Sequence, residues 1–224
     1  MKRIKDRIIK LFKGERGIVT KKYMKRFLPS QPVIVEAGAH IGVDTVELAN
    51  VFHKGEIHAF EPVPSIYKQL VKNTQSHQNI KTHELALASQ NGEADIFVSS
   101  GRSDGSSSLL KPKEHLKIHP DVKFEQKIKI KTITLDDWVK NNGISQVDFL
   151  WLDLQGLELS VLKASKETLK TVKAIYTEIS LVENYENGPL YKELREWLRQ
   201  QGFEIQKEAI EWEDGGNVFF VRKG

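Results

Sequence analysis

Short apolar runs alternate with longer amphipathic segments from residue 33 onwards. Three runs with the composition of buried strands come first, at residues 33–38, 56–62 and 80–87. The segment between the second and third runs places Ile66, Leu70 and Thr74 at a spacing of four, which predicts a helix with one buried face. Strands and helices in this alternating order predict a parallel sheet with right-handed crossover connections.

The segment between the first two runs also has a helical pattern. Residues 43–52 predict a helix that carries Val43, Val46 and Ala49 on one side. We expect that side to face the core.

The alternating order breaks after residue 90. A turn at Asn91-Gly92 precedes a short strand, and residues 124–135 alternate between polar and apolar side chains, as a half-buried strand does. A polar stretch with glycine, serine and proline lies between these two strands. We interpret residues 91–134 as an inserted antiparallel hairpin that carries a long loop. The loop is either a lid over a binding site or a disordered connector, and the sequence favours neither.

The strand and helix order resumes at Thr134, which together with Asp137 resembles a helix capping box. Two more apolar strands follow, one closing on Asp153 and the other ending near Glu178. The last two strand patterns flank the turn at residues 213–216, which predicts a terminal antiparallel hairpin. The sequence therefore predicts an α/β fold: a doubly wound mixed sheet of seven core strands, with the C-terminal antiparallel hairpin at its end and the inserted hairpin beside it.

The positive charge of the chain is concentrated near its N-terminus. The 224 residues suit one domain, residues 29–224, preceded by a basic segment, residues 1–28. Residues 1–26 hold eleven Lys and Arg against two acids, a charge of +9, so the other 198 residues carry −5 of the net +4. The segment has the spacing of one or two amphipathic helices. We expect it to pack across the core as one wall of a pocket; the alternatives are peripheral contact with a membrane surface or with an acidic partner.

Several classes of protein are disfavoured by the sequence. No apolar run approaches the ~20 residues of a membrane span, and the apolar patch near the N-terminus is too short for a secretory signal. The chain has no cysteine, which excludes disulfides and thiolate metal sites. A cytoplasmic location is the simplest interpretation. One basic helix is weak support for a nucleic-acid partner, and we expect none.

The first predicted strand ends in an acid and a glycine-rich turn. Glu36 is followed by Gly38 and Gly42, but the other glycines of a dinucleotide-binding fingerprint are missing, and so is a phosphate-binding loop. A second acid, Glu61, follows the next strand, where a carboxylate can accept hydrogen bonds from ribose hydroxyls. Glu36 can face an ammonium group. A cofactor with a ribose, a cationic amino-acid end and no phosphate fits both acids, and S-adenosylmethionine is such a compound.

A set of motifs over residues 33–182 supports this interpretation. The segments EAGAHIGVDT, AFEPVPSIY, ALASQNGEADIFV, GSSSL, ITLDDW and VDFLWLDLQGLELSVLK resemble, in order and spacing, the FkbM family of S-adenosylmethionine-dependent methyltransferases. The resemblance implies a class I, Rossmann-like methyltransferase fold and methyl transfer, often to a hydroxyl of a sugar, polyketide or other natural product. Three positions depart from the family pattern: Glu36 conservatively replaces the usual Asp, His40 replaces the usual Asn, and Gln155 replaces the Glu of Asp-x-Glu-Gly.

The resemblance also implies a cofactor site. Its residues would be Glu36, Gly38, Ala39, His40, Gly42, Thr45 and Glu61. The Thr45 hydroxyl would meet the methionine carboxylate. Ala86 and Leu87, just past the third strand, would flank the adenine.

We expect the acceptor above the reversal of strand order between the first and fourth strands. Asp153 closes the fourth strand and is our candidate for the general base, although it could instead cap the helix that follows. Glu178 is the second catalytic candidate. The pair could bind Mg²⁺, which prefers oxygen ligands, but we do not expect a metal.

Three further residues would contact the acceptor: Ser107 and Ser108 from the inserted loop, and Gln155. His115 and His119 have the spacing of metal ligands, but we expect an exposed loop there instead.

The sequence thus predicts an enzyme that methylates a hydroxyl oxygen of a small molecule, sugar or natural product. The alternatives are methylation of an amide or amine nitrogen, and a non-catalytic module that binds S-adenosylmethionine. The oligomeric state is left open.

Overall fold

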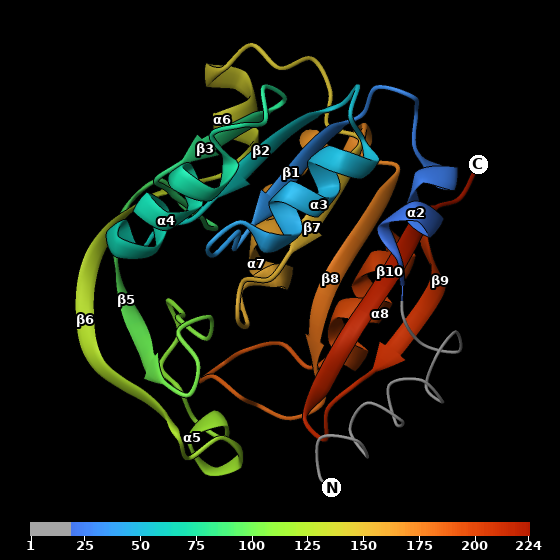
Figure 1. Ribbon diagram of the computed structural model, residues 1–224. Helices are drawn as coiled ribbons and strands as arrows, with labels where there is room; N and C mark the ends of the chain where they lie inside the picture. Colours follow the sequence, from blue (N-terminus) through green and yellow to red (C-terminus); the bar gives the residue numbers. More distant parts are fainter. Residues whose placement is uncertain (1–18) are drawn as a thin grey trace, which may run out of the picture.

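The computed structural model describes residues 19–224, and its centre is a seven-stranded sheet (Figure 1). The strand order is β3-β2-β1-β7-β8-β10-β9. The strands are β1 (Val33–Ala37), β2 (Glu56–Phe60), β3 (Ile80–His83), β7 (Phe149–Leu152), β8 (Ala174–Ser180), β9 (Phe203–Ile210) and β10 (Gly215–Arg222). Only β10 runs against the other six strands, and it pairs antiparallel with both β8 and β9. The predicted mixed sheet, its reversal of order beside β1 and its C-terminal hairpin are confirmed.

Helices cover both faces of this sheet because alternate residues of each strand point to opposite sides. On one face Ile34 and Phe149 join a core cluster with α2 (Lys21–Met24) and α3 (Val43–Val51). On the other face Val35 and Leu150 pack with α6 (Leu135–Asn141), α7 (Glu158–Ala164) and α8 (Tyr191–Gln200). α4 (Pro64–Thr74) lies beside α3 (Figure 1), and η2 (Thr168–Lys170) precedes β8. The result is the doubly wound arrangement that the sequence predicts.

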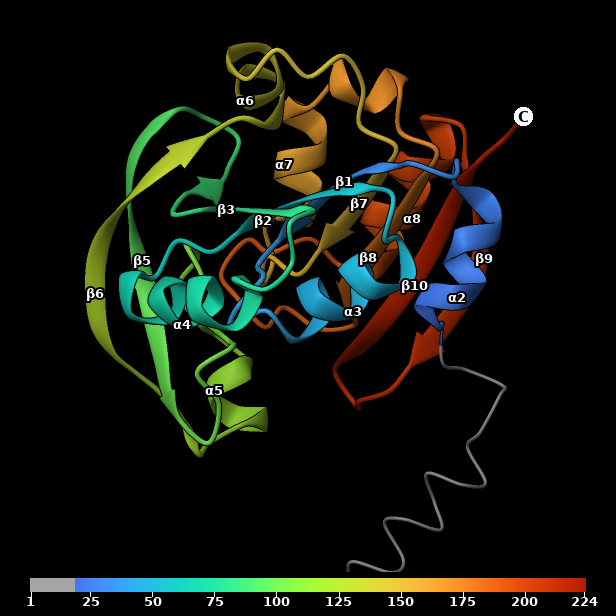
Figure 2. The ribbon, with the colours of Figure 1, turned by 45° about the horizontal axis from the view of Figure 1, so that its top comes forward.

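The predicted insertion forms a small second sheet that extends from one side of the domain (Figure 2). β5 (Gly92–Gly101) and β6 (Val122–Ile133) pair antiparallel, and β4 (Ala86–Leu87) adds to β6 in parallel. The loop between β5 and β6 contains α5 (His115–Ile118) and bridges back to Phe97 and Tyr185. The inserted hairpin is confirmed, and its loop is an ordered structure packed on the domain, which rules out the disordered connector.

The described part of the basic N-terminal segment packs against the sheet. Met24 of α2 is fully buried, and Phe27, in η1 (Lys25–Phe27), lies with its ring centroid 5.6 Å from that of Phe219 on β10. Tyr23 makes a similar edge contact with Phe219 at 6.2 Å. The remainder of the predicted amphipathic segment, residues 1–18, lies outside the described residues. Within residues 19–224 no helix is both long and apolar enough to cross a membrane.

The spacing of apolar residues predicted the buried face of one helix correctly and that of another only in part. Ile66, Leu70 and Thr74 are buried on α4, as predicted. On α3 the buried residues are Thr45, Leu48 and Ala49, so the predicted face was right for Ala49 and wrong for Val43 and Val46. Val43 is 62% exposed because α3 begins directly after the β1 turn, which directs its first residue towards a surface cavity.

Thr134 caps α6 as predicted, since its hydroxyl accepts a hydrogen bond from the backbone N–H of Asp137 at 3.2 Å. The exposed loop expected at His115 was wrong. That side chain is 6% exposed, because its ring packs against Phe124 of the inserted hairpin and against Tyr185.

Candidate active site

The turn after β1 passes very close to the end of β7. Gly38 has φ +85°, and a Cβ built on it would lie 1.9 Å from the backbone oxygen of Asp153. The N–H groups of Gly38 and Ala39 both donate to the carbonyl oxygen of Phe60, at 3.0 and 2.9 Å. Only glycine permits this approach in the left-handed conformation. The turn thereby brings the ends of three strands, β1, β2 and β7, to one point.

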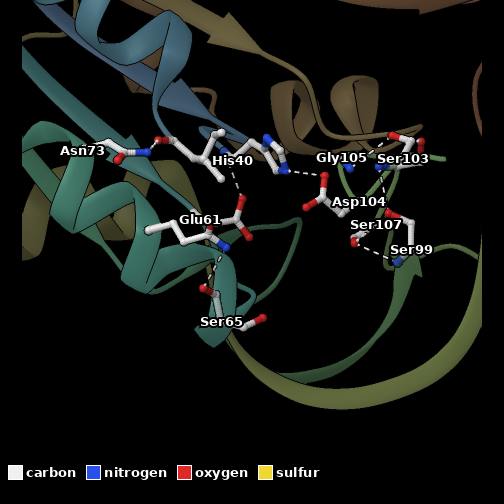
Figure 3. A network of polar contacts seen from close by, with 12 residues as sticks. His40, Glu61, Ser65, Asn73, Ser99, Ser103, Asp104, Gly105 and Ser107 are labelled. Carbon is white, nitrogen blue, oxygen red and sulfur yellow. Dashed lines mark hydrogen bonds and ion pairs between the residues drawn. The ribbon is translucent and has the colours of Figure 1, made fainter. Parts of the chain in front are cut away.

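Glu61 joins the β1 turn to the end of β2 (Figure 3). Its two carboxylate oxygens accept hydrogen bonds from the backbone N–H groups of His40, at 3.1 Å, and Val63, at 2.8 Å. The side chain is 6% exposed, and burial raises its pKa to about 7. A carboxylate offers about four acceptor positions, so the two backbone bonds leave capacity for the hydroxyls of a ligand.

A cavity of about 210 Å³ opens beside Glu61. Ten of the site residues that the sequence predicts line this cavity: Gly38, Ala39, His40, Glu61, Ala86, Leu87, Ser107, Ser108, Asp153 and Gln155. Phe60, Ile66 and Ile96 supply an apolar part of the wall. The cavity therefore combines an apolar wall with convergent polar groups, as cofactor sites do.

Glu36, Gly42 and Thr45 are not in the cavity wall. Glu36 is 1% exposed beneath the turn, and Gly42 packs against α4, where a Cβ would lie 2.8 Å from Leu70 Cδ1. Burial raises the pKa of Glu36 to about 8, and the neighbouring Thr45 hydroxyl opposes this shift through a side-chain hydrogen bond. Both side chains are buried, so neither is exposed to the cavity. The predicted contact of Glu36 with an ammonium group stays a prediction.

Asp153 and Glu178 form a buried carboxyl pair that Gln155 holds together. The side-chain amide Nε2 of Gln155 donates to Asp153 Oδ1 at 2.7 Å and to Glu178 Oε2 at 2.6 Å. Burial raises the pKa of both carboxyls, and repulsion from Asp153 raises the pKa of Glu178 further. Two adjacent buried carboxyls avoid this repulsion by sharing one proton.

Asp153 does not cap α7. Among the described residues, no side chain caps α7. The carboxylate of Glu158 instead holds the loop before the helix, because it accepts hydrogen bonds from the backbone N–H groups of Leu154, at 2.8 Å, and Gly156, at 3.1 Å. α7 begins only at Glu158. Asp153 therefore remains free for chemistry at the cavity.

The inserted loop closes over the cavity through two polar contacts. His40 Nε2 lies 3.0 Å from Asp104 Oδ1 (Figure 3). The Ser108 hydroxyl donates to the backbone oxygen of Gln155 at 2.8 Å. The loop is thus tied both to the β1 turn and to the segment after β7, as a lid would be.

Comparison with known proteins agrees with this geometry. The family model for the methyltransferase FkbM domain matches residues 36–205. The chain belongs to the FkbM methyltransferase family.

Several curated relatives of this FkbM chain are also named as methyltransferases. The 2-O-methyltransferase NoeI of Sinorhizobium fredii is 34% identical over 160 residues, which are 69% of this chain and 66% of the relative. The hexuronic acid methyltransferase AglP of Haloferax volcanii is 23% identical over 172 residues, which are 76% of this chain and 64% of that protein.

Solved structures share the fold of this FkbM chain. An FkbM methyltransferase from Methylobacillus flagellatus aligns with a TM-score of 0.51 at 13% identity, covering 90% of this chain and 50% of the other. Aeropyrum pernix fibrillarin, solved with bound S-adenosyl-L-methionine, aligns with a TM-score of 0.53 at 13% identity, covering 87% and 69% of the two chains. At these identities the likeness shows the Rossmann-like class I methyltransferase fold.

Two residues of the FkbM site were missed by sequence reasoning. The Tyr185 hydroxyl lies 2.7 Å from Gln155 Oε1 and 2.9 Å from the backbone oxygen of Ser106, so its single proton is shared between them. Asp104 contacts His40. Both residues lie in irregular segments without a motif. The charge of Asp104 was the only signal in the sequence that could have identified either as a site residue.

The buried acids predict how the stability of the free FkbM chain depends on pH. The folded-state pKa is about 8 for Glu36 and about 7 for Glu61 and Glu158, all above the ordinary value. The folded state therefore binds more protons than the unfolded state, and the free energy of unfolding decreases as the pH rises. Burial lowers the pKa of three histidines, which opposes this trend, but the opposition fades above about pH 6.5 as histidine in the unfolded state loses its proton.

We therefore expect the melting temperature to fall between about pH 6.5 and 8. Calorimetric melting of wild type and Glu36→Gln measures this, and the stability gained by the variant should grow with pH. Glu93→Gln, at an exposed position on β5, is the control. A wild-type melting temperature that rises over this range would contradict the assignment.

Proposed function

We propose that the chain is an S-adenosylmethionine-dependent methyltransferase that transfers a methyl group to a hydroxyl oxygen. The observation that carries this proposal is the carboxyl pair of Asp153 and Glu178 at the edge of the cavity that Gly38 and Glu61 line. The name of the relative NoeI as a 2-O-methyltransferase supports oxygen as the acceptor atom.

The cavity suits the parts of this cofactor. The free acceptor positions of Glu61 would bind the ribose hydroxyls, and Ala86 and Leu87 would flank the adenine together with the apolar wall. Glu36 is buried below the turn and outside the cavity wall, so it would meet the ammonium group only if the turn moves when the cofactor binds. When bound, S-adenosylmethionine supplies a methyl group that is already electrophilic.

The chain's own residues then have two tasks, alignment and proton removal. A hydroxyl held against the carboxyl pair can donate its proton to Asp153, while Glu178 retains the proton that the pair shares. Fixing the reacting groups in place can supply ~7–11 kcal/mol of the barrier reduction. An amide nitrogen is a weaker nucleophile and would need stronger base assistance than a hydroxyl.

Calorimetry with S-adenosylmethionine and S-adenosylhomocysteine tests the proposal at its first step. We expect both to bind and NAD to bind much more weakly. A screen that detects released S-adenosylhomocysteine over sugars, polyketides and peptides tests the second step. Equal affinity for NAD would overturn the cofactor, turnover of amides alone would favour nitrogen as the acceptor, and binding without any turnover would favour a non-catalytic module.

Removing metal ions should leave turnover unchanged. Within residues 19–224 no group of three or more His, Asp or Glu side chains gathers as metal ligands do, and Gln155 already donates to both carboxyls of the pair. Turnover measured after treatment with EDTA, and again after adding Mg²⁺, checks this. Activity that is lost with EDTA and restored by Mg²⁺ would show that the pair holds the ion.

A further inference from the structure

A second cavity, of about 670 Å³, reaches the carboxyl pair from another side. α2 and α3 form one of its walls and cover the same face of the sheet (Figure 1). The residues on its opposite wall come from the carboxyl ends of β7 and β8 and from the start of β10.

The two cavities meet at the proposed base. Asp153 lines both of them, whereas Glu178 lines only the second. Methyl transfer requires the acceptor atom and the cofactor on opposite sides of the methyl group, with the acceptor within hydrogen-bond reach of the base. Of the two cavities, the second meets these requirements once the first holds the cofactor.

We infer that this second cavity is the acceptor site and that it takes a neutral, polyhydroxylated ring, such as a sugar without a carboxylate or phosphate. The inference rests on the proposed function, and it adds the position of the acceptor and its charge.

One exposed aromatic ring provides a surface for such an acceptor. Trp151 is 8% exposed and packs against Tyr176, with ring centroids 4.1 Å apart at 39°, so its ring belongs to the core. Trp212, at the turn between β9 and β10, is 47% exposed and also lines the cavity. The face of an aromatic ring carries partial negative charge, so it attracts the C–H face of a sugar ring, and the hydroxyls at the ring's edge remain available to polar groups.

The charge of the cavity disfavours an anionic acceptor. Among residues 19–224, its lining holds four acids and two lysines: Asp44, Glu47, Asp153, Glu178, Lys21 and Lys22. Because Asp153 and Glu178 share one proton, these groups leave a surplus of one negative charge. The Lys21 ammonium is 2.5 Å from Asp44 and 2.8 Å from Glu47, so its charge is already paired. It also lies 4.5 Å from the centroid of the Trp151 ring. The surplus acids would accept hydrogen bonds from hydroxyls and repel a carboxylate.

A matched pair of sugars tests the charge of the acceptor. Methyl α-D-glucopyranoside and methyl α-D-glucopyranosiduronate differ only in a CH₂OH or a carboxylate at C6. We expect the full-length chain to bind the neutral sugar at least about tenfold more tightly, a difference of ~1.4 kcal/mol. Tryptophan fluorescence measures binding to the free protein and to the protein saturated with S-adenosylhomocysteine. Equal or tighter binding of the uronate, or no binding of either sugar, would overturn the inference.

Trp212 tests the position of the site, because its exposure allows replacement without loss of the core. Trp212→Ala should raise the Kd for the neutral sugar about tenfold, or ~1.4 kcal/mol, and Trp212→Phe should restore most of the affinity. Ile210→Ala is the control, since Ile210 is also 47% exposed but lies outside the cavity. The Kd for S-adenosylhomocysteine should stay unchanged in all three variants.

The outcomes separate this inference from the proposed function. If S-adenosylhomocysteine fails to bind the wild-type chain, the proposed function fails, whatever the sugar data show. If it binds but Trp212→Ala leaves sugar affinity unchanged, the acceptor lies elsewhere and only the present inference fails.

Discussion

Replacing Asp153 with asparagine is expected to lower kcat by about 10²–10⁴-fold, the usual contribution of a general base. Asparagine keeps the shape of the side chain but cannot accept the hydroxyl proton. Its oxygen can still accept the hydrogen bond that Gln155 Nε2 now gives at 2.7 Å, so the local structure should survive. The Kd for S-adenosylhomocysteine should therefore change little, which separates a catalytic role from a binding role.

Single-turnover kinetics with the best acceptor from the screen, together with calorimetry, measure both quantities. Asp95→Asn is a suitable control, because Asp95 pairs with Lys127 on the inserted hairpin, outside both cavities. Glu178→Gln should produce a smaller loss, since Glu178 carries the shared proton and is not the acceptor of the new one. Wild-type kcat in Asp153→Asn would remove the base from the mechanism and favour alignment alone as the source of catalysis.

Regular elements were predictable from the sequence because their signals are local. The spacing of Ile66, Leu70 and Thr74 predicts the buried face of α4. The pair Thr134 and Asp137 predicts the start of α6. The order of apolar strands then determines the sheet, because parallel strands need crossover helices and these have one preferred hand. The exposure of Val43 at the start of α3 could not be predicted from local spacing, because it depends on the cavity beside the helix.

Contacts between irregular segments were not predictable in this way. Tyr185 reaches Gln155 across 30 positions and Asp104 reaches His40 across 64, and no periodicity connects them. These contacts depend on how the inserted loop folds back over the cavity, which is a property of packing. The proximity of candidates at strand ends was easier to predict. Asp153, Gln155 and Glu178 lie within hydrogen-bond distance, because the carboxyl ends of parallel strands share one edge of the sheet.

The departure from the family pattern at Gln155 also acquires a physical meaning. A glutamate at this position would place a third carboxyl between two buried carboxyls. The neutral amide instead donates to both of them, and its oxygen accepts a hydrogen bond from the Tyr185 hydroxyl. The pair is therefore held in place by an uncharged group, which keeps the shared proton on the pair and ties its position to the inserted loop.

The second large effect is expected from Gly38→Ala, which should lower the free energy of unfolding by more than ~3 kcal/mol and abolish binding of S-adenosylhomocysteine. The left-handed conformation alone costs an alanine roughly 1–2 kcal/mol. The new Cβ would also lie 1.9 Å from the backbone oxygen of Asp153, and a strand end held by sheet hydrogen bonds cannot move aside without loss. The turn would have to separate from β7, which displaces the backbone that Glu61 holds.

The variant Gly143→Ala separates the effect of backbone strain from the effect of the steric clash. Gly143 has φ +64°, and no atom lies within 4 Å of a Cβ built there, so this variant has the backbone strain without the clash. Chemical denaturation should place it about 1 kcal/mol below wild type, with cofactor affinity unchanged. Equal stability of the two variants would mean that the β1 turn can withdraw from β7. The two cavities would then not be fixed relative to one another at Asp153, and the close approach at Gly38 would lose its part in placing the base against the cofactor.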